Sequence, residues 1–391
     1  MISITRLLCG SEYYGDSLRY RPGAGKEIHG TSPGSGPVVI WNITQSCNLK
    51  CKHCYANSES KKYEGELSPK EGLKLVDDLA AFKVPVILFS GGEPLIREDF
   101  FDLASRAAKL GIRATISTNG TLITPDTARS IKKVGISYVG ISLDGLGELN
   151  DRFRGSQGAF DQALQGIRAC REAGQKVGLR FTINRHNFNQ IEDILYLVKE
   201  EKIPRVCFYH LVYTGRGKEM IKEDISHEET REVLDLLMEK TKEFHQKGQE
   251  KEILTVDNHA DGPYIYMKMK EKDPEKAQEI LELITINGGN RSGMAVGSIN
   301  SLGDVYPDQF TRTHKLGSVK ERSFKEIWTN EDNEFLRKLR DRKPLLKGRC
   351  SSCRWLDMCN GNFRARAEAF TGDYWETDPA CFLTDEEIRA D

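Results

Sequence analysis

The sequence predicts an α/β protein, built as an open, partial TIM-like barrel and followed by a smaller, cysteine-bearing C-terminal domain. Three observations lead to this fold. Six apolar, β-branched runs alternate with six helical patterns, which indicates a parallel sheet with right-handed crossovers. Polar residues that look functional follow the ends of successive strands, as they do in barrels of this kind. Four of the ten cysteines lie in residues 345–391. A doubly wound sheet is the competing α/β architecture.

The elements follow one another regularly as far as residue 250. Buried parallel strands read as near-continuous apolar runs, and a Ser followed by Pro marks the start of a helix. Ser68 and Pro69 give that signal for the first helix. Strands are predicted at 38–43, 84–89, 113–117, 138–143, 177–183 and 206–212, and helices at about 68–82, 98–110, 124–134, 160–173, 189–201 and 228–247.

Three domains are expected along the chain: an N-terminal arm (1–37), the partial barrel (38–250) and a C-terminal domain (251–391). Residues 10–37 are rich in Gly, Ser and Pro, which predicts a loop. After residue 250 the pattern becomes irregular over 254–300. We expect a short strand pair at 295–299 and 304–306, then one helix over about 323–340.

Composition limits the classes of function. The chain has 391 residues, of which 38% are hydrophobic and 29% charged, and this excludes a disordered protein. Its 57 basic and 58 acidic residues leave no basic excess for nucleic-acid binding. No run of 18 apolar residues predicts a membrane span, and no export signal is recognisable. We therefore expect a cytoplasmic, reducing location, where clustered cysteines are metal ligands rather than disulfides.

The first cysteine cluster follows the first predicted strand. Cys47, Cys51 and Cys54 have the spacing C-x3-C-x2-C. Three thiolates can hold three irons of a 4Fe–4S cluster and leave the fourth iron open for a reaction. A zinc site with His53 as the fourth ligand is the alternative, because zinc needs four ligands when it is structural.

This spacing, with Tyr55 after the third cysteine, resembles the radical S-adenosylmethionine (SAM) superfamily. Motifs at the ends of the next strands also match: Ser-Gly-Gly-Glu-Pro at 90–94, Ser-Thr-Asn-Gly at 117–120 and Ser-Leu-Asp-Gly at 142–145. By resemblance, Glu93 would accept from the methionine ammonium, Ser142 would contact the cofactor, and Arg154 would pair with its carboxylate. The set expected to bind SAM is Tyr55, Gly91, Gly92, Glu93, Asn119, Ser142, Arg154 and Leu211.

The resemblance implies radical chemistry. A reduced cluster would pass one electron to SAM, and the resulting 5′-deoxyadenosyl radical would take a hydrogen atom from the substrate. An electron donor of the flavodoxin or ferredoxin type is implied as a partner.

A second cysteine cluster stands near the end of the sequence. Cys350, Cys353, Cys359 and Cys381 form a closed set of four thiolates, suited to a 4Fe–4S cluster or to structural zinc. The segment resembles the SPASM-type iron–sulfur extension of radical SAM enzymes, which carries two auxiliary clusters.

Two departures from that extension change the expected cluster count. Asp308 and Phe363 stand where the SPASM pattern has cysteines. We therefore expect one auxiliary cluster, fully ligated by Cys and used for electron transfer.

Within the superfamily, the chain resembles the branch that acts on tetrapyrroles. The resemblance includes the N-terminal arm and the segment Cys-Asn-Gly-Asn-Phe-Arg at 359–364. It implies an enzyme of siroheme-dependent haem biosynthesis, which removes two acetate side chains, on rings A and B of 12,18-didecarboxysiroheme. Methyl groups would remain, and the product would be Fe-coproporphyrin III.

Two other substrate classes remain open. Haem d1 maturation or the oxidative decarboxylation of coprohaem is one, and SPASM-type peptide maturation is the other. Only about 37 residues precede the first strand, too few for a peptide-docking domain, which favours a small molecule.

A substrate with several carboxylates and an iron calls for cations and for an axial histidine. The candidates are Arg180, Arg216 and Arg291, and His29, His210, His259 and His314. Cys170 and Cys207 are expected to be small buried apolar residues, and Cys9 has no assigned role.

Overall fold

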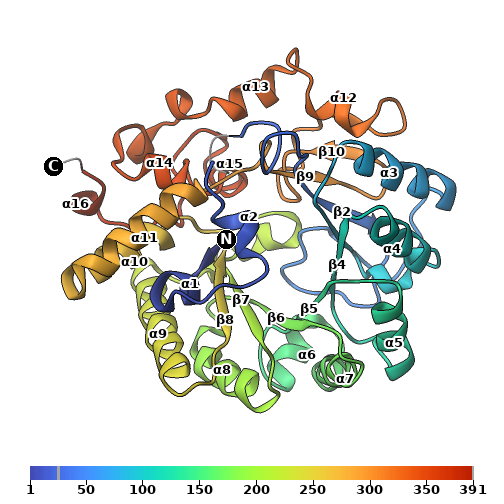
Figure 1. The fold of residues 1–391 in the computed structure, drawn as a ribbon, viewed down its shortest axis with the longest axis horizontal. Helices are drawn as coiled ribbons and strands as arrows, with labels where there is room; N and C mark the ends of the chain where they lie inside the picture. Colours follow the sequence, from blue (N-terminus) through green and yellow to red (C-terminus); the bar gives the residue numbers. More distant parts are fainter. Residues whose placement is uncertain (24–26, 390–391) are drawn as a thin grey trace. The chain divides into compact units, whose positions relative to one another are not determined.

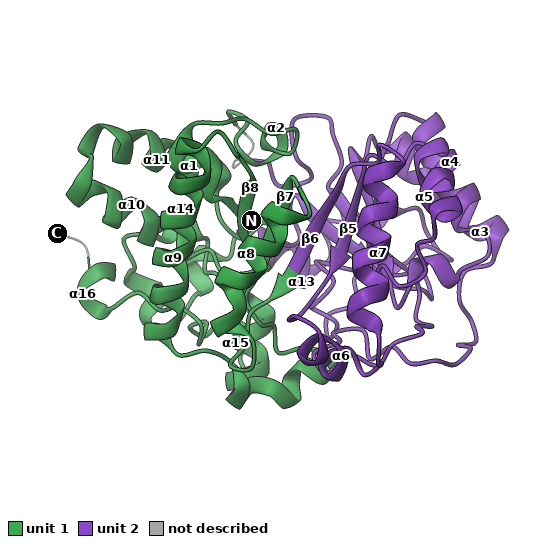
Figure 2. Cartoon of the chain, turned by 90° about the horizontal axis from the view of Figure 1, so that it is seen from below, with its two compact units in different colours: residues 1–26, 181–291, 341–391 green, residues 27–180, 292–340 purple. Residues whose placement is uncertain are grey.

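The computed structural model describes residues 1–23 and 27–389, which form two compact units (Figure 2). Unit 1 contains residues 1–26, 181–291 and 341–391, and unit 2 contains residues 27–180 and 292–340. The three domains expected from the sequence are continuous ranges, whereas each unit combines separate stretches of the chain. The three domains stay a prediction. Residues 24–26 of the expected arm and 390–391 of the expected C-terminal domain lie outside the described residues.

Unit 2 contains a mostly parallel sheet. Its strand order is β6-β5-β4-β3-β2-β9-β10-β11, with parallel pairing from β6 to β9 and antiparallel pairing of β10 with β9 and β11. The strands are β2 (Val38–Thr44), β3 (Val86–Gly91), β4 (Arg113–Thr118), β5 (Tyr138–Ser142), β6 (Val177–Thr182), β9 (Val296–Ile299), β10 (Asp304–Tyr306) and β11 (Gly317–Ser318). The boundary between the units falls inside β6.

The two faces of this sheet differ in character. Trp41, Phe89 and Ile141 are fully buried on one face. Because side chains alternate along a strand, their neighbours Asn42, Ser90 and Ser142 share the opposite face. The strands therefore present polar side chains on one face, near their carboxyl ends.

Helices connect the parallel strands of unit 2, and α3, α4 and α5 lie to the outer side of β2 and β4 (Figure 1). Ser68 forms a capping box with Glu71 and Pro69 occupies the first turn, as the sequence predicts. The helices of unit 2 are α3 (Pro69–Ala81), η2 (Pro94–Ile96), α4 (Phe100–Lys109), α5 (Pro125–Lys133), α6 (Glu148–Arg154), α7 (Ala159–Glu172), α12 (Phe324–Trp328) and α13 (Glu334–Arg340).

Unit 1 contains β7 (Arg205–Tyr209), β8 (Glu252–Val256) and β1 (Ile2–Ser3). β8 runs parallel to β7 and antiparallel to β1. Its helices are α1 (Ile4–Cys9), α2 (Asp16–Arg19), η3 (Phe188–Gln190), α8 (Ile191–Glu200), η4 (Gly215–Glu223), α9 (His227–Gln246), α10 (Asp261–Lys272), α11 (Pro274–Asn287), η5 (Lys343–Leu345), η6 (Gly348–Ser352), α14 (Leu356–Cys359), α15 (Arg364–Thr371) and α16 (Asp385–Ile388).

The predicted α/β class, its six parallel strands and the later strand pair are confirmed. The irregular region expected at 254–300 is wrong, because β8, α10 and α11 occupy most of it. The first turn of α10 contains Gly262 and Pro263, and neighbouring Gly and Pro are typical of a turn in a sequence. The single helix expected at 323–340 is two helices. The Asn333 side chain accepts from the Leu336 amide, as an N-cap does, so a second helix, α13, begins there. The arm expected to be a loop contains the short helix α2.

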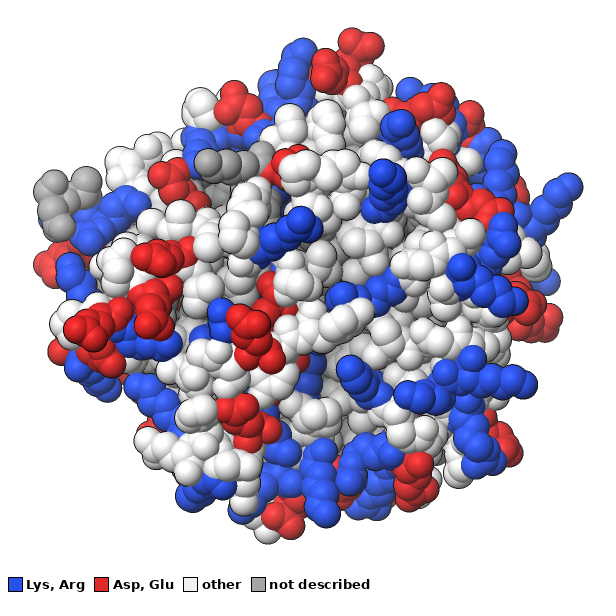
Figure 3. Space-filling model, viewed as in Figure 1, with Lys and Arg blue, Asp and Glu red and all other residues white. Residues whose placement is uncertain are grey.

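Charged residues of both signs are scattered over the face seen in Figure 3, in keeping with the formal net charge of −1. No helix among the described residues has the length and apolar character needed to cross a membrane.

Candidate active site

The first three cysteines lie in the loop after β2. Cys47 and Cys51 are buried and pack with Leu49 and Ala159, and Cys54 lies against them. The amides of Lys50 and Lys52 donate to carbonyls at the end of α6, which anchors the loop. Burial raises the pKa of Cys47 to about 12. A thiolate here therefore needs a compensating cation, and bound iron would supply it.

Glu93 joins the ends of β3 and β4. Its side chain is fully buried, and one oxygen accepts from Thr118 Oγ1 at 2.8 Å and from the Leu95 amide at 3.1 Å. The other oxygen accepts from the Asn119 amide at 2.8 Å. Burial raises the pKa of Glu93, and these hydrogen bonds oppose that rise. The carboxylate is thus held in one orientation at the ends of two strands.

Asn119 links this carboxylate to the cysteine loop. Its Nδ2 donates to Asn48 Oδ1 at 2.9 Å and lies 3.9 Å from Cys47 Sγ. The expected SAM-binding residues Glu93 and Asn119 are therefore together, beside a cysteine.

Gly91 and Gly92 allow two backbone segments to approach closely. A Cβ atom at Gly91 would lie 2.2 Å from the Thr44 carbonyl oxygen, and one at Gly92 would lie 2.1 Å from that of Ser46. The Gly92 amide donates to Thr44 and the Glu93 amide to Ser46. The two glycines are needed for this close packing of two backbone segments within the chain. The sequence suggested only that they let a ligand approach the backbone.

Tyr55 reaches from the cysteine loop to the polar face of the sheet. Its hydroxyl donates to Asn42 Oδ1 at 2.9 Å and lies 3.2 Å from Ser90 Oγ. Ser142 ends β5 in register with Arg180 of β6. Among the expected SAM-binding residues, Leu211 alone belongs to unit 1, where its carbonyl accepts from Arg366 at 2.9 Å.

Arg154 has partners within the chain. Its Nη2 lies 2.6 Å from Asp144 Oδ2, and its Nη1 donates to Cys51 Sγ at 3.6 Å. His53, the alternative zinc ligand, has Nε2 3.6 Å from the same Asp144 oxygen. Asp144 is fully buried, and the sequence assigned it no role although it stands in the Ser-Leu-Asp-Gly motif. Its burial beside two basic side chains is a long-range property that a motif does not reveal.

The second set of cysteines lies in unit 1. Cys350, Cys353, Cys359 and Cys381 all line one cavity, together with the apolar side chains of Trp355, Leu356, Leu383 and Ile388. Burial raises the pKa of Cys359 well above its usual value, and the three other thiols add to the rise. Four thiols that line one apolar cavity suit a fully ligated cluster.

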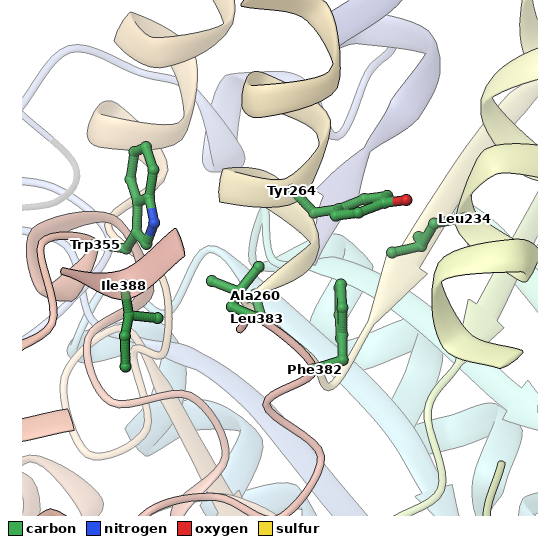
Figure 4. Packing of buried hydrophobic residues seen from close by; sticks show 7 residues of the cluster. All are labelled: Leu234, Ala260, Tyr264, Trp355, Phe382, Leu383 and Ile388. Atoms are coloured by element: carbon green, nitrogen blue, oxygen red, sulfur yellow. The ribbon is translucent and has the colours of Figure 1, made fainter. Parts of the chain in front are cut away.

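An apolar cluster supports this cavity. Figure 4 shows seven of its residues, which come from α9, α10 and the C-terminal segments. The Trp355 indole donates to the Glu387 carbonyl at 2.8 Å. The cluster is Leu234, Ala260, Tyr264, Trp355, Phe382, Leu383 and Ile388, with Cys353 and Cys381 packed against it.

The turn after Cys359 explains why Asn, Gly and Asn occupy the next three positions. Asn360, Gly361 and Asn362 have φ values of 55°, 81° and 55°, a left-handed conformation that Asn and Gly tolerate. The side chain of Asn360 donates to the Asn290 carbonyl, and that of Asn362 to Asn258. The two asparagines thus hold Cys359 at the end of α14.

Two arginines follow this turn with contrasting partners. Arg366 forms a fully buried bidentate pair with Asp378 and also donates to two carbonyls. Arg364 donates from Nη1 to two carbonyls, whereas its buried Nε and Nη2 have no hydrogen-bond partner in the part of the chain that the structure describes. Arg364 lowers the pKa of Cys350 and Cys359 against the dominant effect of burial, so its charge lies close to the cavity.

The two departures from the SPASM pattern are both buried. Phe363 is 5% exposed, and its amide donates to Asp378. Asp308 is 4% exposed, and its oxygens accept from Phe310 and Thr311. The side chain of Phe363 has no ligand atom, and the Asp308 oxygens accept hydrogen bonds within their own loop.

The candidate substrate residues are scattered over the two units. Arg180 and His314 belong to unit 2, and the His314 ring stacks on Phe335 at 3.8 Å. His210 Nε2 lies 3.0 Å from Asp261 Oδ2 in unit 1. Arg216, Arg291 and His259 are also in unit 1, and His29 is in unit 2, where its carbonyl accepts from Trp328.

The ten cysteines are free thiols, and Cys170 and Cys207 are buried as expected. Within residues 1–23 and 27–389, no group of three or more His, Cys, Asp or Glu side chains is arranged as a metal site. The assignment of individual thiols to clusters therefore rests on their spacing, burial and convergence, and stays a proposal.

Comparison with known proteins identifies the class to which this site belongs. Residues 41–198 match the model of the Radical SAM superfamily, and residues 294–354 match the SPASM iron–sulfur cluster-binding domain. Cys359 and Cys381 lie beyond the matched part of that domain. The structure of Streptococcus suis SuiB bound to S-adenosylmethionine has a TM-score of 0.71 at 21% identity, and the match covers 90% of this chain and 78% of SuiB. That likeness concerns the fold alone.

Two curated relatives match almost the whole chain. Fe-coproporphyrin III synthase of Methanosarcina barkeri (strain Fusaro / DSM 804) is 54% identical over 394 residues, 99% of each chain. Pre-heme d1 synthase of Dinoroseobacter shibae (strain DSM 16493 / NCIMB 14021 / DFL 12) is 43% identical over 374 residues, which cover 95% of this chain and 91% of the relative.

The chain belongs to the radical SAM superfamily and carries a SPASM-type domain. It is an enzyme that uses SAM with a 4Fe–4S cluster, and the SPASM domain adds an auxiliary iron–sulfur cluster.

Proposed function

We propose that this enzyme removes the acetate side chains on rings A and B of 12,18-didecarboxysiroheme, which leaves methyl groups and gives Fe-coproporphyrin III. The observation that carries the proposal is the 54% identity, over 99% of both chains, with a protein named Fe-coproporphyrin III synthase. The polar face of the unit 2 sheet, beside the first three cysteines, is suited to hold the cofactor.

We assign the SAM-binding cluster to Cys47, Cys51 and Cys54, with Gly91, Gly92, Glu93, Asn119 and Ser142 around the cofactor. When bound, the cluster and SAM supply a 5′-deoxyadenosyl radical that takes a hydrogen atom from the substrate. Glu93 and Asn119 support this assignment because they are fixed to each other beside Cys47.

We assign the auxiliary cluster to the four cysteines of the unit 1 cavity. Full ligation by protein leaves no iron free for substrate, so the cluster serves electron transfer. We further propose that a flavodoxin- or ferredoxin-type protein supplies electrons and that the enzyme acts in the cytoplasm.

Turnover tests the substrate. Anaerobically reconstituted protein is incubated with SAM, dithionite and 12,18-didecarboxysiroheme, and the tetrapyrrole is followed by mass spectrometry. Stepwise loss of two acetate groups, with about one 5′-deoxyadenosine for each, is the expected result. An untouched pigment with abundant 5′-deoxyadenosine would contradict the proposal and favour a related substrate, such as that of the pre-heme d1 synthase relative.

A further inference from the structure

The loop after β10 is shaped by Asp308, one of the two residues that replace a cysteine of the SPASM pattern. One oxygen of its carboxylate accepts from the Phe310 and Thr311 amides at 2.8 and 2.7 Å, and the other from Thr311 Oγ1 at 3.0 Å. The carboxylate is therefore occupied within its own loop. In this chain, Asp308 supports a turn.

This turn places an aromatic ring and a cation against Tyr55. The rings of Phe310 and Tyr55 meet edge to face, with centroids 5.1 Å apart. Arg312 donates from Nη1 to the Tyr55 carbonyl at 3.0 Å, and its guanidinium carbon lies 6.0 Å from the Tyr55 ring centroid. Because Tyr55 follows Cys54 directly, the loop borders the proposed SAM-binding cluster.

A second arginine, Arg180 of β6, lies on the face of the sheet that Tyr55 reaches. Gly140 has no side chain, and a Cβ atom there would lie 2.8 Å from Arg180 Cδ, so the arginine lies across the polar face of the sheet at this glycine. The Tyr55 hydroxyl donates to Asn42 on this polar face. Arg180 and Tyr55 therefore share one face of the sheet.

Within residues 1–23 and 27–389, the charge of Arg312 has no carboxylate partner. Its guanidinium makes one hydrogen bond there, to the Tyr55 carbonyl. A guanidinium has five N–H donors in a fork that matches a carboxylate, so most of its donors are available to a ligand.

We propose that Tyr55, Phe310 and the two arginines form the wall of a substrate site. The aromatic rings contact the flat macrocycle, and Arg312 and Arg180 each bind a peripheral carboxylate. The inference rests on the proposed function and adds the residues that recognise the substrate.

Equilibrium binding tests this wall without turnover. Iron coproporphyrin III and its tetramethyl ester are titrated into the reconstituted enzyme and followed by absorption. Arg312→Met and Arg180→Met are each expected to weaken binding of the acid roughly 10- to 100-fold, the value of a charged hydrogen bond, and to leave ester binding unchanged. Arg312→Lys keeps the charge and is expected to recover part of the affinity.

The control is Arg322→Met, which removes an exposed arginine of the same unit and is expected to change neither affinity. Equal weakening of acid and ester binding would show that the arginine acts on the fold and not on a carboxylate, and this would overturn the proposed contact. Unchanged binding by Arg312→Met would overturn it too. If the wild-type enzyme binds the acid no better than the ester, the carboxylate site is refuted even where turnover succeeds. If it binds neither, the proposed function itself fails.

Discussion

Arg154 and Asp144 form a buried ion pair against the proposed SAM-binding cluster. Arg154 Nη2 lies 2.6 Å from Asp144 Oδ2, and the two residues are 7% and 0% exposed. Arg154 Nη1 also donates to Cys51 Sγ. The pair therefore connects the strand end of β5 to the cysteine loop through one guanidinium.

A double-mutant cycle measures this connection. Removing one member of a buried pair leaves an uncompensated charge and typically costs about 3–5 kcal/mol. We expect Asp144→Asn and Arg154→Met each to lower the free energy of unfolding by about 3 kcal/mol, and the double variant to lose clearly less than the sum. Urea titration under anaerobic conditions provides the values. Additive losses would show that the two side chains do not stabilise each other.

Iron content tests the assignment of the cysteines. The wild-type enzyme is expected to hold about eight irons, and the triple variant of Cys350, Cys353 and Cys359 to Ala about four. The same result, with loss of SAM cleavage, is expected for Cys47, Cys51 and Cys54. Cys170→Ala is the matched control, because this buried thiol lies on α7 and belongs to neither set. Zinc in place of the second four irons would refute the electron-transfer role.

We expect the reduction potential of the auxiliary cluster to depend on Arg364. Its buried Nε and Nη2 have no hydrogen-bond partner among the described residues, and its charge acts on Cys350 and Cys359. A nearby positive charge favours the reduced, more negative cluster. We expect Arg364→Met to lower the midpoint potential by roughly 40–90 mV, which corresponds to about 1–2 kcal/mol for one electron. Titration followed by electron paramagnetic resonance measures it.

The control for this shift is Lys347→Met, which removes an exposed cation that pairs with Asp373. A midpoint potential that is equal in Arg364→Met and the wild type would show that the arginine has a packing role alone.

Local patterns were sufficient to predict the strands and the cysteine sets. The runs that became β2 and β4 are short, apolar and β-branched, and the spacing of Cys47, Cys51 and Cys54 is itself the signal. These features depend on neighbours in the sequence, so periodicity and spacing reveal them.

Contacts between distant residues could not be predicted in this way. Arg154 and Asp144 are ten positions apart, and Arg312 and Tyr55 are separated by more than half the chain. Whether an arginine lies buried beside a carboxylate or points to solvent depends on how the elements pack. The sequence pattern named Arg154 as a SAM ligand, but it carried no signal for Arg312 or for the turn that Asp308 supports.

The buried imidazole of His259 makes stability depend on pH. Burial lowers its pKa well below 6.5, and the nearby cations, among them Arg342 and Arg366, lower it further. Because the unfolded chain takes up a proton near pH 6.5 and the folded chain does not, the unfolded state gains protons first as the pH falls. The contribution of His259 to stability is therefore complete above about pH 6.5 and is lost below it.

We expect the wild-type melting temperature to fall between pH 7.5 and 5.5. This one group lowers the free energy of unfolding with a limiting slope of about 1.4 kcal/mol per pH unit. His259→Gln removes the titration and should flatten the profile, even though its stability at pH 7.5 is lower. His245→Gln is the matched control, because this exposed histidine pairs with Glu250 at the surface. If the His259→Gln profile is as steep as that of the wild type and the control, a different group unfolds the protein in acid, and folding does not lower the pKa of His259.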